Sequence, residues 1–136
     1  MKHGKKIELL LKKAAEDEYI LDKISSDANA SDEIFGFHAQ QAAEKLLKAL
    51  LLKLGSSYAQ THRIAELVDL VKQKGVAFPE KLEDIIDLTP FAVIFRYDSI
   101  PEENQQPVDR LRLRGLLKEL RKWVESLLKN QSGKQG

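Results

Sequence analysis

The chain has 136 residues and no cysteine, which excludes disulfide bonds, thiolate metal sites and cysteine nucleophiles. A hydrophobic fraction of 43% with a charged fraction of 32% is typical of one compact soluble domain and excludes a disordered chain. The net charge of +1 excludes the overall basic excess of a general nucleic-acid binder, so polyanion binding would need a local patch.

Apolar residues at helical spacing predict a first helix that residues 25–27 close. Asp17 and Glu18 lie inside its apolar stripe, where another apolar residue is expected. A second helix should begin near Ser31, a good N-cap, and end at Gly55, placed as a C′ glycine. Its apolar residues cover more than one face, which is typical of the central helix of a bundle or of an oligomer interface.

Two further helical segments are predicted before the end of the chain. Thr61 is expected to cap a third helix that stops at Gly75, and Phe78–Pro79 to open a fourth. Pro90 predicts a kink or break, because it disfavours helical geometry at the preceding residue. The apolar run Phe91–Phe95 has no partner strand, so we expect it to be helical after the kink.

The last helix should begin around Pro107, after a loop over residues 99–106. It carries a basic run, which predicts either a solvated face or a patch that faces RNA or a partner: Arg110, Arg112, Arg114, Lys118, Arg121 and Lys122. The sequence thus predicts an all-α, up-and-down bundle of about five helices, with a four-helix core plus a short kinked helix. The helical domain should cover residues 5–129, with a disordered polar tail over 130–136.

Polar and aromatic residues recur along these helices in a particular order. They are Ala14-x-x-Asp17, His38-x-x-Gln41-Ala42-x-Glu44-Lys45-x-x-Lys48-Ala49, His62 and Arg96-Tyr97. In this order and spacing the chain, from about Ala14 to Leu127, resembles the HEPN family of small all-helical domains. The resemblance implies a helical bundle, and it implies frequent pairing with minimal nucleotidyltransferases.

One branch of that family cleaves RNA without a metal, using an arginine followed after a short gap by a histidine. A histidine can move a proton near neutral pH, while an arginine stabilises charge on the phosphate. Arg96 matches the arginine, but Pro101, Glu102 and Glu103 follow, and no histidine comes after His62. The resemblance therefore favours binding over cleavage.

Arg96 and Tyr97 are open to two interpretations. Arg96 is either a buried arginine paired with Asp17 or Glu18, or a cleft residue that contacts a nucleotide phosphate at a dimer seam. The two are compatible if Asp17 orients Arg96. Tyr97 is most often an aromatic residue at the core edge, and modification of this tyrosine is conceivable from the family's pairing with nucleotidyltransferases.

His38, Gln41, Lys45 and Lys48 fall on one face of the second helix. They form either a solvated face, with Glu44 and Lys48 supporting the helix, or the wall of a nucleotide pocket. His62 is expected to make a local bond near a helix start rather than to bind a metal. Neither a glycine-rich phosphate loop nor a nucleophile elbow occurs in the sequence.

The first hypothesis is a homodimeric binding protein that contacts nucleotide or RNA and acts with a nucleotidyltransferase in a toxin–antitoxin-like pair. The second is a divergent metal-independent ribonuclease toxin, and the third is a dimeric scaffold without a ligand. We expect no cofactor, metal or catalytic residue, no membrane contact, and a cytoplasmic location. The candidate phosphate-binding residues are Arg96, Tyr97, Asp17, His38, Gln41 and Lys45.

Overall fold

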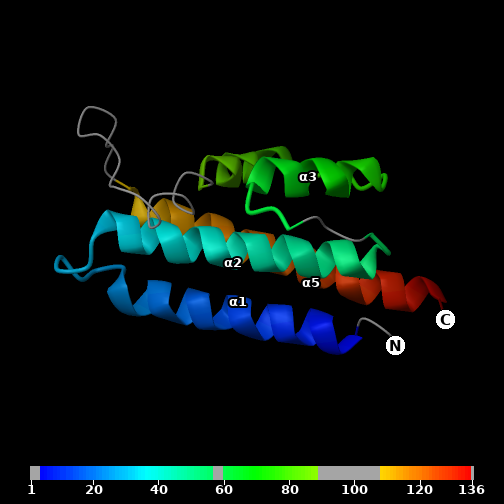
Figure 1. Cartoon of the computed structure of the whole chain (residues 1–136), viewed down its shortest axis with the longest axis horizontal. Coiled ribbons are helices and arrows are strands. Elements are labelled where there is room, and N and C mark those ends of the chain that lie inside the picture. Colours follow the sequence, from blue (N-terminus) through cyan, green and yellow to red (C-terminus); the bar gives the residue numbers. More distant parts are fainter. Residues whose placement is uncertain (1–3, 57–59, 89–107, 136) are drawn as a thin grey trace.

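Helices make up every regular element within the residues that the computed structural model describes, 4–56, 60–88 and 108–135. They are α1 (Gly4–Ile24), α2 (Asp32–Lys53), α3 (Ile64–Gln73), the 3-10 helix η1 (Glu80–Leu88) and α5 (Arg110–Gln135). Helix α2 runs through the middle of the bundle, and α1, α3 and α5 pack around it (Figure 1). The predicted all-α helical bundle is confirmed.

The ends of α1 and α2 lie where the sequence predicts them. Helix α1 ends at Ile24, directly before the closing residues 25–27. Ser31 caps α2, because its hydroxyl accepts a hydrogen bond from the backbone N–H of Ile34 at 3.1 Å. Gly55 follows the helix with φ +80°, a left-handed conformation that favours glycine. Local sequence alone therefore sets the length of the central helix.

The apolar surface of α2 is buried inside one chain. Its fully buried residues contact α1 on one side and α3, η1 and α5 on the others; they are Phe35, Ala39, Ala42, Ala43, Leu46, Leu47, Ala49, Leu50 and Leu51. The wide apolar surface is thus that of a central bundle helix, and it does not argue for an oligomer interface. The prediction of a homodimer loses this support.

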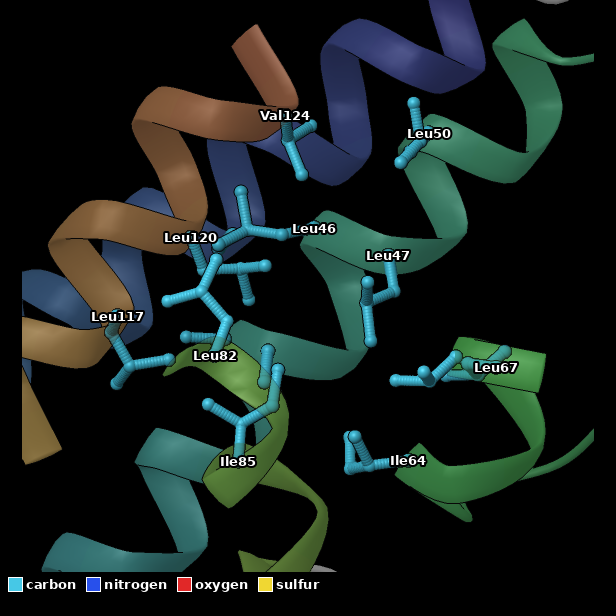
Figure 2. Close-up of a cluster of buried hydrophobic side chains, with 14 of the residues drawn as sticks. Leu46, Leu47, Leu50, Ile64, Leu67, Leu82, Ile85, Leu117, Leu120 and Val124 are labelled. Atoms are coloured by element: carbon cyan, nitrogen blue, oxygen red, sulfur yellow. The ribbon is translucent and has the colours of Figure 1, made fainter. Parts of the chain in front are cut away.

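The largest buried side chains meet where four elements converge (Figure 2). Leu46 of α2 lies beside Leu120 of α5 in this view, and both belong with Leu50 and the residues of η1 and α3 to one hydrophobic cluster. In η1, Leu82 and Ile85 are both buried. A residue spacing of three places them on the same face of a 3-10 helix, which explains why this short segment docks on the core.

Two predicted starts differ from the structure. Helix α3 begins at Ile64 after Arg63, and the hydroxyl of Thr61 instead accepts from the backbone N–H of Arg63 at 3.0 Å and donates to Glu66 at 2.7 Å. Thr61 therefore shapes the turn before the helix and is not its cap, a role that threonine takes readily because its side chain is short. The segment after Phe78 and Pro79 is a 3-10 helix from Glu80.

Helix α5 begins three residues after Pro107. The carboxylate of Asp109 accepts from the backbone N–H of Arg112 at 3.0 Å, as an N-cap does. The helix continues to Gln135, and the division into a helical domain over 5–129 and a disordered tail over 130–136 stays a prediction.

Several predictions concern residues outside the described ranges. These are the kink at Pro90, the helical run Phe91–Phe95, the loop over 99–106, and the positions of Arg96 and Tyr97. Within the described residues, no helix combines the length and the apolar character that crossing a membrane requires.

Candidate phosphate-binding site on α2

The buried acid of α1 binds two side chains of α2. Asp17 faces α2 at a side-chain exposure of 10%, and its Oδ1 lies 2.9 Å from Nδ1 of His38. Its Oδ2 accepts from Nζ of Lys45 at 2.6 Å. His38 and Lys45 remain 23% and 25% exposed, so both reach solvent beside the same carboxylate. Three of the predicted site residues are therefore brought together, and we call them the Asp17 site.

Gln41 lies on α2 between His38 and Lys45, one turn from each. Its Nε2 donates to Oε1 of Gln40 at 2.8 Å, and it is partly exposed. Gln41 therefore flanks the Asp17 site without bonding to Asp17. Its bond to Gln40 instead attaches it to a second polar group on α2.

That second group centres on the buried carboxylate of Glu44. Its Oε1 accepts from Gln40 at 2.7 Å, and its Oε2 accepts from Lys48 at 2.7 Å. Nδ1 of His62, from the turn before α3, lies 3.0 Å from the same Oε2. We call Gln40, Glu44, Lys48 and His62 the Glu44 cluster. The local Glu44–Lys48 pair was predicted, but its burial and the long-range contact of His62 were not.

Polar groups inside the described part of the bundle are fully satisfied. Within it, every buried side-chain nitrogen or oxygen has a hydrogen-bond partner. The Glu44 cluster illustrates this, because the amide oxygen of Gln40 accepts from Gln41 while its nitrogen also donates to the backbone oxygen of His62 at 3.2 Å. A satisfied network holds its members in one geometry, since any other rotamer would leave a buried polar group without a hydrogen-bond partner.

The second acid of α1, Glu18, lies about 100° around the helix from Asp17 and meets α5. Its Oε1 lies 3.2 Å from Arg114, and its Oε2 accepts from Nε of Arg121 at 2.8 Å. Arg114 also makes two bonds to Asp22, at 2.6 and 3.1 Å, and this contact lowers the pKa of the Asp22 carboxyl. Arg114 and Arg121 are therefore partners of Glu18, one of the two acids for which the sequence suggested Arg96.

Part of the predicted basic run on α5 thus points inward. Besides Arg114 and Arg121, Arg110 turns toward the α1–α2 connection, where it bonds to Asp32 at 3.0 Å and to the backbone oxygen of Ile24 at 2.8 Å. The interpretation of the run as one solvated face is wrong for these three arginines. Their side chains join α5 to α1 and to the start of α2, a structural role.

Arg96 and Tyr97 lie outside the described residues, so the expected contact between Arg96 and Asp17 is untested. Within the ranges 4–56, 60–88 and 108–135, no group of three histidine, aspartate or glutamate residues could hold a metal ion. The chemistry available at the Asp17 site is that of a lysine ammonium and an imidazole, both held by one carboxylate.

Comparison with known proteins gives a family for this fold. The family model described as HEPN domain matches residues 7–129, nearly the whole chain. The search of curated proteins and the search of solved structures found no match.

Proposed function

The chain belongs to the HEPN domain family, and from this membership we propose that it is a binding protein for the phosphate of a nucleotide or RNA. The Asp17 site is the proposed contact, with Arg96 and Tyr97 completing it. The family is associated with RNA binding, RNA cleavage and toxin–antitoxin systems, which supports the choice of ligand.

The observation that carries this proposal is the fixed position of Lys45. One of its three ammonium hydrogens is directed at Asp17, which leaves donors for an incoming oxygen. Because the side chain is already held, less conformational entropy is lost when it binds phosphate. Gln41 offers a further amide beside it, partly exposed to solvent.

Lys45→Ala should weaken binding of a short single-stranded RNA about tenfold, because a charge-assisted hydrogen bond contributes on the order of 1.5–3 kcal/mol. The measurement is a binding titration at fixed low salt, since phosphate contacts weaken with ionic strength. Lys53→Ala, on the last turn of the same helix, is the matched control and should bind as the unaltered protein does. Equal affinity in the two variants would contradict the proposed site, and absence of binding in the unaltered protein would favour the ligand-free scaffold.

We further propose that a nucleotidyltransferase is the protein partner, in a toxin–antitoxin-like pair. The support is the family membership alone. Co-expression with a nucleotidyltransferase encoded beside this chain, followed by affinity purification of one of the two, would test the pairing.

A homodimer remains a prediction. In the structure the exposed large apolar residues include Leu9, Tyr19, Ile34 and Leu111, so apolar side chains remain at the surface of one chain. We expect sedimentation at low micromolar concentration to give a species of twice 15.4 kDa. A single species of 15.4 kDa would show that the protein is a monomer.

The second candidate function is metal-independent RNA cleavage, and one observation favours it. His38 is oriented by the Asp17 carboxylate at 2.9 Å, an arrangement that general bases use. This histidine lies on α2, whereas the ribonuclease motif would place one after Arg96. We expect no appreciable cleavage in an RNA digestion with EDTA. Efficient cleavage that both His38→Ala and Arg96→Ala abolish would instead establish the ribonuclease.

A further inference from the structure

The hydrogen bond between His38 and Asp17 determines which nitrogen of the imidazole can change its charge state. An ionised carboxylate only accepts hydrogen bonds, so Nδ1 of His38, at 2.9 Å from Oδ1, must carry a hydrogen. This holds for the neutral and for the charged ring alike. Gain or loss of a proton therefore takes place at Nε2, and within the described residues no side chain bonds to that atom.

Among the residues that the structure describes, the charges around His38 nearly cancel while the ring is neutral. Asp17 contributes −1 and Lys45, bonded to it at 2.6 Å, contributes +1. The neighbouring charged groups are themselves paired: Glu44 with Lys48 on α2, and Glu18 with arginines of α5. His62, from the turn before α3, also lies on this side of α2, against Glu44. The Asp17 site is thus neutral with neutral His38 and carries +1 with charged His38.

Neutral Nε2 presents a lone pair, which repels the oxygen of an anion, whereas charged His38 presents an N–H donor. We propose that phosphate binding at the Asp17 site is coupled to protonation of His38 at Nε2, so that the bound anion lies between this donor and Lys45. The inference rests on the proposed function and adds its regulation: the proton comes from solvent, and ligand affinity rises as pH falls.

Like His38, His62 contacts a carboxylate through its Nδ1, but the lysine beside that carboxylate is less exposed. Its Nδ1 lies 3.0 Å from Glu44, so its Nδ1 also carries the hydrogen and Nε2 faces away from the carboxylate. The lysine that shares this carboxylate, Lys48, is only 10% exposed, whereas Lys45 is 25% exposed. An anion at Nε2 of His62 would therefore lack an accessible lysine on the same carboxylate. This makes His62 the matched control for His38.

The probe must keep its own charge constant across the pH range. A phosphate monoester gains a proton near pH 6, so we choose a dinucleoside monophosphate, whose single phosphodiester stays at −1. Calorimetric titrations at pH 6 and pH 8 should show affinity on the order of fivefold or more higher at pH 6, the usual size of a coupling between two binding events. At intermediate pH, titrations in two buffers of different ionisation enthalpy should show proton uptake on binding.

His38→Gln should remove both the pH dependence and the proton uptake, while His62→Gln should retain them. Circular dichroism would establish that both variants are folded, and the proton uptake of the unaltered protein tests the inference without any variant. Binding of equal strength at both pH values, without proton uptake, would overturn the coupling and leave the proposed function in place. No binding at either pH would instead overturn the proposed function, and the coupling with it.

Discussion

Glu44→Ala is expected to destabilise the protein by about 3–5 kcal/mol, the usual cost of removing one partner of a buried ion pair. The carboxylate is 6% exposed and accepts hydrogen bonds from Gln40, Lys48 and His62. Alanine would leave the ammonium of Lys48, itself 10% exposed, without the charge that neutralises it. Urea unfolding followed by circular dichroism measures the loss.

Glu16→Ala is the control for this experiment. Glu16 is also a helical glutamate in a salt bridge, with Lys13 at 3.6 Å, but both side chains are more than half exposed. Such pairs contribute roughly 0.5 kcal/mol or less. The double variant Glu44→Ala with Lys48→Ala should recover part of the loss, because no buried charge then remains uncompensated. If Glu44→Ala cost no more than Glu16→Ala, the cluster would have no role in stability.

Glu18→Ala should lower the free energy of unfolding by about 3 kcal/mol, toward the lower end of the range for a buried ion pair. Glu18 lies between Arg114 and Arg121, at 3.2 and 2.6 Å, and its side chain is 7% exposed. Both arginines keep a second acid, Asp22 and Glu125, so their charges are not left wholly uncompensated. A change of this size corresponds to a shift of roughly 10 °C in Tm.

The same variant should loosen α1 from α5 in particular. Hydrogen exchange would then increase at the backbone amides of α1 more than at those of α3, which has no bond to Glu18. Asp22→Ala is the comparison, because its carboxylate bonds to Arg114 but is 52% exposed, and it should cost far less. Equal losses in the two variants would mean that burial of Glu18 does not matter.

The helices follow from local sequence, and their ends show why. The helix-end signals are Ser31, before the acidic first turn of α2, and Gly55 and Gly75, which have positive φ. Each acts on backbone groups only a few residues away, so it can be recognised from the sequence. Thr61 shows the limit of this approach. A threonine near a predicted start can cap the helix or form the preceding turn, and only the position of Ile64 in the core decides between them.

Asp17 could be identified as unusual from sequence because it interrupts an apolar stripe. Its partners could not be identified from the sequence, because His38 and Lys45 lie 21 and 28 residues away. They face Asp17 only once α1 packs along α2. The Glu44 cluster was missed for a related reason. A glutamate and a lysine four residues apart have the same sequence pattern whether the pair is exposed or buried. Only the folded position of His62 against Glu44 shows that this pair is buried in a cluster.

The sequence by itself determined the helical class, the end of α1, both ends of α2, and the presence of two acids where α1 should be apolar. Only the tertiary structure decided which basic side chains pair with each of these two acids. Asp17 and Glu18 are neighbours in sequence, but the helical turn directs one toward α2 and the other toward α5. Long arginine side chains then reach Glu18 from 96 and 103 residues away, because α5 lies near α1 in the folded bundle. No local pattern encodes a pairing that depends on how distant helices are aligned.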